Sequence, residues 1–177
     1  MLKKISAFVL CLGIAHPLAA MADDSLVKFK GGIGVIPVSS AAGVVNADGT
    51  SPNVNRNVVR GVNPAGQIWV IADLKADIKA DGRVKVRGKG LRLGGGNGIG
   101  SNGNLIVHAT LICEAIPPFT LHDTNLTGVA LEADGDFRID DVLSPGVPSV
   151  CASPVLLIRN ASGVWFAAGF PDLGNDD

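Results

Sequence analysis

The chain has 177 residues, and its 15 basic and 16 acidic side chains give a formal net charge of −1. A chain without an excess of positive charge is not expected to bind nucleic acid or an anionic membrane. Aromatic residues make up 5% of the sequence, tyrosine is absent and glycine occurs 23 times. This composition favours short strands and tight turns over helices.

Residues 1–22 have the pattern of a secretory signal peptide. The pattern consists of a basic start, a short apolar core and a small-residue cleavage site, found at Lys3 and Lys4, Ile5 to Ala15, and Ala20 to Ala22. We therefore predict cleavage after Ala22 and a soluble, extracytoplasmic domain over residues 23–177, with a disordered acidic tail at 174–177. No apolar run reaches the length of a bilayer, so no transmembrane segment is expected.

Alternation of apolar and polar residues predicts a first strand at Leu26–Lys30, which resumes after a break at Gly31-Gly32. Pro37 indicates that this strand lies at the edge of a sheet. The Leu26–Val38 segment is therefore a candidate for self-association by edge pairing.

The clearest pattern is in Ile68–Leu93, where apolar residues mostly occupy even positions and charged residues mostly odd ones, on both sides of Gly82. It predicts a long hairpin with one buried and one solvated face. A two-residue turn would place Ile78 opposite Lys85. A three-residue turn ending at a left-handed Gly82 instead places Ile78 opposite Val84. Because register does not mix apolar and charged residues on a buried face, we predict the three-residue turn.

The same turn chemistry recurs at three other glycines, Gly66, Gly135 and Gly163. Each is expected to adopt a left-handed conformation at the end of a three-residue turn. The turn at Gly135 predicts a second hairpin, with Val129 opposite Ile139.

Two segments are predicted to be long surface loops. Ser39–Asn57 is rich in small and polar residues, and Gly94–Asn104 is mostly glycine and asparagine. The second segment contains G-x-G-x-x-G, but a dinucleotide site needs that motif between a strand and a helix. Leu105–Cys113 follows it and alternates like a strand, so no cofactor is expected. Val58–Val62 is predicted to be the strand that follows the first loop.

Val155–Ile158 is continuous and apolar, so it is predicted to be a central strand that is buried on both faces. Gly163–Phe170 is expected to pair with it. Together these elements predict a single all-β domain, mostly antiparallel, as a sandwich or partly closed barrel of about eight to ten strands.

Cys113 and Cys151 are the cysteines that follow the predicted signal peptide. Such a pair in an exported chain predicts one disulfide bond. The bond would close a loop of about 39 residues and contribute about 4 kcal/mol in the chain-entropy model. Two free buried thiols are the main alternative, and metal ligation by the two cysteines is another.

No nucleophile motif such as G-x-S-x-G and no H-E-x-x-H zinc motif occurs in the sequence. His108 and His122 lie near Glu114 and Asp123 and are the candidates for a small metal or acid–base site. Histidines that are merely solvated or hydrogen-bonded are the simpler interpretation. We therefore assign no catalytic residue and no metal.

Two charge clusters are candidate binding surfaces. The acidic cluster offers oxygen ligands for calcium but lacks the spacing of an EF-hand; its members are Asp134, Asp136, Asp140 and Asp141. The basic row could dock a polyanion, but we expect a solvated sheet face that Asp73 and Asp77 partly neutralise; its members are Arg83, Lys85, Arg87, Lys89 and Arg92. Asn125-Leu126-Thr127 and Asn160-Ala161-Ser162 match the glycosylation triplet.

Four segments resemble small uncharacterised exported bacterial β-domain proteins. They are Asn57–Val62, Trp69–Ala72, Asp134–Ile139 and Pro154–Arg159. The resemblance covers most of the chain after residue 22. It implies an exported β-domain and carries over no catalytic residue.

Three functions are compatible with the sequence. The first hypothesis is a non-enzymatic extracytoplasmic binding or surface protein, based on the predicted export, the low net charge and the missing catalytic motifs. One alternative is a small metal-dependent or hydrolytic enzyme that uses the histidine and acidic candidates. The other is a self-assembling component that pairs through an exposed edge strand.

Overall fold

The computed structural model describes residues 24–40, 46–49 and 54–174. The predicted signal peptide and cleavage site, and residues 175–177 of the predicted tail, lie outside the described residues. Within the described part the chain forms strands only, and it contains no helix that could cross a membrane. These strands, in chain order, are β1 (Ser25–Gly34), β2 (Val38–Ser40), β3 (Val54–Arg56), β4 (Trp69–Val70), β5 (Asp73–Lys79), β6 (Arg83–Lys89), β7 (Arg92–Leu93), β8 (Ile106–Ile112), β9 (His122–Asp123), β10 (Val129–Ala130), β11 (Phe137–Val142), β12 (Val155–Arg159) and β13 (Trp165–Pro171).

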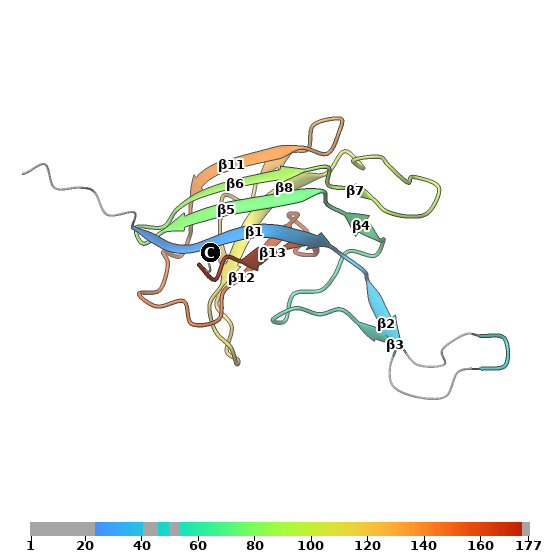
Figure 1. The fold of residues 1–177 in the computed structure, drawn as a ribbon, viewed down its shortest axis with the longest axis horizontal. Helices are drawn as coiled ribbons and strands as arrows, with labels where there is room; N and C mark the ends of the chain where they lie inside the picture. The colour runs from blue at the N-terminus through green and yellow to red at the C-terminus, as the bar shows by residue number, and fades with distance from the viewer. Residues whose placement is uncertain (1–23, 41–45, 50–53, 175–177) are drawn as a thin grey trace, which may run out of the picture.

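Nine of these strands form one sheet in the order β10-β8-β12-β13-β1-β5-β6-β11, with β9 also paired to β8. The sheet curls into a half-barrel, and β11, β6, β5 and β1 arch across the molecule (Figure 1). The predicted all-β, antiparallel, partly closed architecture is therefore confirmed. Two small sheets, β2–β3 and β4–β7, extend it, and β2–β3 projects from it as an arm.

The long hairpin β5–β6 has the predicted register, with Ile78 opposite Val84. Gly82 adopts a φ of 88°, the left-handed conformation that the three-residue turn needs. Beyond a break at residues 71–72 and 90–91 the pairing continues in the same register, since Trp69 of β4 lies opposite Leu93 of β7.

The core lies inside the curl, where the inward residues of the large sheet form one hydrophobic cluster. The prediction that β12 is buried on both faces is confirmed, since Leu156, Leu157 and Ile158 are all fully buried. Arg159, at the end of β12, lies beside residues 60–63 and Phe119, which line a common depression of about 330 Å³.

The disulfide Cys113–Cys151 is also confirmed, with 4.6 Å between the two Cα atoms.

The prediction that Leu26–Val38 forms a sheet edge is wrong. β1 lies in the interior of the sheet between β13 and β5, and only Val38 belongs to the arm. Glycines allow this position: Gly31 has a φ of 83°, and a Cβ on Gly32 would lie only 2.7 Å from the carbonyl oxygen of Ala168 on β13. A strand without side chains at these points can approach its neighbours more closely than other residues permit.

The predicted pairing of Val129 with Ile139 is also wrong. The turn forms as expected, with Gly135 at a φ of 84°, but β10 then pairs with β8 and β11 with β6. The carbonyl of Gly135 accepts a hydrogen bond of 2.9 Å from the backbone of Leu91, which holds the turn against the β6–β7 connection. The two strands therefore diverge to opposite edges of the sheet.

The region around Gly66 differs from the expected turn. Gly163 has the predicted positive φ, 86°, whereas Gly66 does not adopt a left-handed conformation. Pro64 instead forms a parallel bridge with Trp165, so the segment runs along β13 and does not fold back on itself. Residues 58–62 do not form the predicted strand either, because a tight turn at positive-φ Arg60 and Gly61 interrupts them.

Gly88 should be intolerant of a side chain, because it faces the ring of Phe137 across β6 and β11. A Cβ at this position would lie 2.0 Å from a ring carbon of Phe137. We expect Gly88→Ala to lower the free energy of unfolding by about 1–3 kcal/mol, measured by chemical denaturation. The control is Gly66→Ala, whose Cβ meets nothing within 4 Å. Equal effects of the two substitutions would contradict the packing argument.

Candidate functional site

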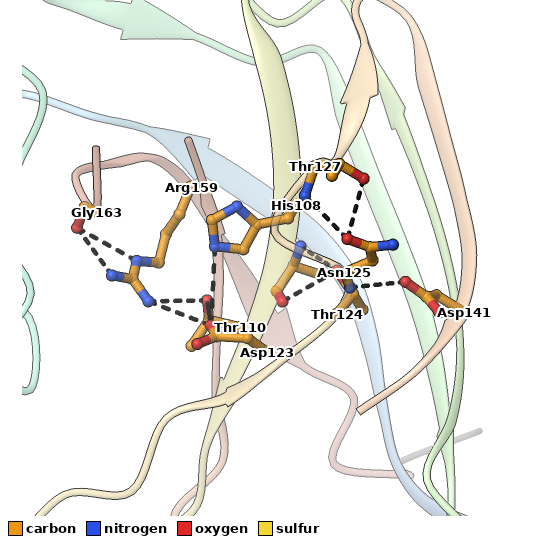
Figure 2. Close-up of polar contacts among 10 residues, drawn as sticks. His108, Thr110, Asp123, Thr124, Asn125, Thr127, Asp141, Arg159 and Gly163 are labelled. Carbon is orange, nitrogen blue, oxygen red and sulfur yellow. Dashed lines mark hydrogen bonds and ion pairs between the residues drawn. The ribbon is translucent and has the colours of Figure 1, made fainter. Parts of the chain in front are cut away.

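Polar residues interrupt the buried centre of the sheet at β8, β9 and β12. His108 lies directly opposite Arg159 in the pairing of β8 with β12. Thr110 lies opposite Asp123 in the pairing of β8 with β9. Because opposed residues, and residues two apart in a strand, point to the same face, these four side chains gather on one side of the sheet. Figure 2 shows this group, which we call the buried polar cluster.

Arg159 is the centre of the cluster. Its Nη1 donates hydrogen bonds of 3.2 Å to Asp123 Oδ1 and 3.2 Å to Thr110 Oγ1. Its Nε and Nη2 donate to the carbonyl of Gly163 at 3.3 and 3.0 Å (Figure 2). The Thr110 hydroxyl also donates to Asp123. The guanidinium therefore links the β12–β13 turn to β8 and β9, and the Asp123 carboxylate balances its charge.

His108 is the group of the cluster that lacks hydrogen bonds. Its side chain is 2% exposed, and neither ring nitrogen has a hydrogen-bond partner among the described residues. Its Nε2 lies 3.8 Å from Asp123 Oδ1. Burial lowers the pKa of His108 below its ordinary value; the Asp123 carboxylate opposes this shift and the Arg159 charge adds to it. The imidazole is therefore neutral at pH 7.

The structure brings together only two of the four sequence candidates, His108 and Asp123. His122 lies opposite Leu111, and its side chain therefore points to the other face of the sheet, where Nδ1 is hydrogen-bonded to the Pro145 carbonyl at 3.0 Å. Glu114 follows the end of β8 and accepts a hydrogen bond from the backbone of Thr120, which lowers the pKa of Glu114. The two histidines do not converge, so the hypothesis of a histidine-centred site loses its geometric basis.

The geometry of the cluster favours a structural role over catalysis. Thr110 is fully buried, and its hydroxyl contacts a carboxylate and a guanidinium and makes no hydrogen bond with the histidine. Sequence reasoning missed Arg159, although a charge directly after the apolar run Leu156–Ile158 is a usable signal. A charge on a central strand must find a partner inside the fold.

Polar contacts also close the gap between the two edges of the half-barrel, which we call the seam. The backbones of Asp123 and Ser144 exchange hydrogen bonds of 2.9 and 2.8 Å, and Asp141 Oδ2 accepts one of 2.7 Å from the backbone of Asn125. Beside these contacts lies a cavity of about 280 Å³. Its lining consists of Val107, Thr124, Asn125, Thr127, Gly128, Val129, Ile139, Asp140 and Asp141.

The glycosylation triplet at residues 125–127 forms a local turn at this seam. Asn125 Oδ1 accepts hydrogen bonds of 3.0 Å from both the backbone and the hydroxyl of Thr127 (Figure 2). The triplet therefore has a structural explanation, because it forms the turn that connects β9 with β10.

The acidic residues considered for calcium are held in separate places. Asp134 accepts from the backbone of Asp136 at 3.0 Å, and Asp136 accepts from the backbone of Gly90 at 2.9 Å. Asp140 and Asp141 lie on β11, where Asp141 contacts the seam. Across residues 24–40, 46–49 and 54–174, no three acidic, histidine or cysteine side chains are grouped as metal ligands.

A groove lies between the arm and the glycine-rich loop after β7. It measures about 580 Å³ and is lined by Ile36, Pro37, Val38, Gly66, Gln67, Ile68, Gly95 and Gly96. The three large apolar side chains among them are 43–54% exposed. This groove is hard to recognise from sequence patterns, because its walls come from three segments that are each predicted to be a loop, a turn or a strand end.

The ion pair of Arg159 with Asp123 can be tested by a double-mutant cycle. Removing one partner leaves the other charge poorly compensated, so Arg159→Met and Asp123→Asn should each lower the free energy of unfolding by about 2–4 kcal/mol. The double variant should lose clearly less than the two single losses combined. Chemical denaturation of the four proteins measures the coupling, and purely additive losses would show that the two residues act independently.

The pH dependence of stability tests the state of His108. Because its pKa is lowered in the folded protein, the unfolded chain takes up a proton first as the pH falls, and stability drops below about pH 6.5. We expect His108→Leu to lose less unfolding free energy than the natural protein between about pH 7.5 and 5.5. Urea denaturation at both values provides the comparison. Parallel losses in the two proteins would rule out this titration.

Comparison of the chain with protein-family models, curated proteins and solved structures found no match. The buried polar cluster, the seam cavity and the groove are therefore the observations from which a function can be inferred.

Proposed function

We propose that the chain is a non-enzymatic, extracytoplasmic binding protein whose ligand surface is the groove between the arm and the glycine-rich loop. The observation that carries this proposal is the exposure of Ile36, Val38 and Ile68 in one concave surface. Clustered apolar residues on a concave surface are typical of a ligand or partner site.

Extracytoplasmic location is supported by two features. The Cys113–Cys151 disulfide is of the kind that persists in oxidising compartments and is rare in the cytosol. The predicted signal peptide at residues 1–22 would deliver the chain to such a compartment.

The groove suits an extended apolar segment as its ligand. One wall is the start of the arm, where Ile36 and Val38 offer apolar contacts, and the opposite wall contains Gly95 and Gly96, which carry no side chain. The volume of the groove falls in the range of natural ligand sites. An extended chain could also hydrogen-bond to the arm, because β2 and β3 have only each other as strand partners among the described residues.

Self-association through the arm is a second candidate function, favoured because β2 and β3 have only each other as strand partners among the described residues. The exposed side chains of Val38 and Val54 lie on β2 and β3. A second copy of the chain could add its own arm to this small sheet. This proposal replaces edge pairing through β1, which is an interior strand.

Enzymatic function is the weaker alternative, for a chemical reason. The charges of the buried polar cluster neutralise one another, and the one histidine in it is covered. No described side chain of the groove is a nucleophile or carries a charge, since Gln67 is its polar member.

The groove is tested with the double variant Ile36→Asp/Ile68→Asp. Two charges in an apolar site should weaken binding of the fluorescent apolar probe ANS, and of apolar peptides from a library, by about tenfold or more. The control is Val142→Asp, an exposed apolar residue on β11 outside the groove, which should leave probe binding nearly unchanged. Unaltered binding by the double variant would contradict the proposal. Sedimentation velocity on the natural protein and on Val38→Asp tests self-association, which requires a dimer that this substitution dissociates.

A further inference from the structure

Four basic residues form a line across the outer face of the half-barrel. Lys30 on β1 lies opposite Lys75 on β5. Lys75 lies opposite Arg87 on β6, and Arg87 lies opposite Arg138 on β11. All four side chains are exposed, and the residues that flank the last three in their strands are buried. We call this line the cross-strand row; it runs at right angles to the basic row seen in the sequence of β6.

Acidic side chains compensate the cross-strand row only at one point. Lys75 Nζ lies 3.8 Å from Asp73 Oδ2. Within the described part of the chain, Lys30, Arg87 and Arg138 make no ion pair. Like charges placed directly opposite one another destabilise a sheet. Packing therefore does not explain why four adjacent strands carry positive charges at residues in register. Binding of an anionic ligand would explain this arrangement.

The neighbouring rows differ from this one. On one side, residues in register across the same four strands alternate in sign: Lys28, Asp77, Lys85 and Asp140. On the other side, Asp73 lies opposite Lys89. The excess of positive charge is therefore one residue wide and four strands long.

We propose that the cross-strand row binds a single chain of an anionic polysaccharide of the polyuronate class. Neighbouring strands are about 4.8 Å apart, so the row presents cationic groups at short, even steps. A polyuronate carries a carboxylate on every sugar ring and can place its acid groups along such a line. Arg87 and Arg138 can each hold a carboxylate with two parallel hydrogen bonds.

Other polyanions match the surface less well. A nucleic acid duplex or a membrane needs a broad positive surface, and the aspartates of the flanking rows oppose it. Single-stranded nucleic acid stacks successive bases on aromatic side chains. Exposed Phe170 lies beside Gly31 at one end of the row, so it offers a single stacking position.

The proposal goes beyond the proposed function, because the cross-strand row shares no residue with the groove. The test measures binding of polygalacturonate by calorimetry at low and moderate salt. The variant Arg87→Gln/Arg138→Gln removes two members of the row. The control, Lys85→Gln/Lys89→Gln, removes the same amount of charge from β6, at residues that each lie opposite an aspartate.

We expect the row variant to bind polygalacturonate about tenfold more weakly or worse, and the control to change by less than about threefold. Added salt should weaken binding by the natural protein more than binding by the row variant. All changed side chains are exposed, and equal thermal unfolding midpoints would verify that both variants fold. Equal losses in the two variants, or no binding by the natural protein, would overturn the proposal. Equally tight, row-dependent binding of polyglutamate would also overturn it, because the site would then recognise acidic peptides.

Discussion

The half-barrel depends on one constraint: the strands of the large sheet bury an apolar inner face. The even positions of β5 and β6 meet across the hairpin, and the inward residues of β1, β11 and β12 continue the same surface. A slip of one residue in any ladder would turn apolar side chains outward and charges inward. The register is therefore fixed by burial, and the opposite charges on the outer face adapt to it.

The same constraint explains why the buried charge of Arg159 is so completely paired. Arg159 is too buried to be solvated by bulk water. Its guanidinium therefore donates hydrogen bonds to Asp123, Thr110 and Gly163. His108 remains neutral because an additional positive charge at this site would be buried beside Arg159. The buried polar cluster stabilises β8, β9 and β12 in one arrangement, which is a structural role and not a catalytic one.

Local patterns in the sequence were sufficient to predict the hairpin β5–β6, its turn and the disulfide. Each depends on residues whose chemistry is unambiguous: alternating charges, a left-handed glycine and two cysteines. The position of β1 was not predictable in this way, because Pro37 indicated an edge while the glycines that let β1 enter the sheet carry no hydrophobic signal. The separation of β10 from β11 depends on Leu91, which contacts the Gly135 turn from far away in the sequence.

The candidate sites, too, were predictable from local patterns only in part, because contacts between distant segments complete them. His108 and Asp123 were recognised as chemically interesting, but their partner Arg159 comes from a strand 36 positions after Asp123, and sequence spacing alone does not place it there. The groove and the cross-strand row are assembled by register between strands. Neither has a continuous motif, so in the sequence their residues look like unrelated surface positions.

The disulfide has a topological consequence for the seam. Cys113 follows β8, which pairs with edge strand β10, and Cys151 precedes β12, the other neighbour of β8. The disulfide closes the chain between the two cysteines into a covalent ring. The ring contains β9, edge strand β10 and the opposite edge strand β11. Both margins of the sheet are therefore tethered through that ring, and a parting of the margins would deform a loop that is already closed.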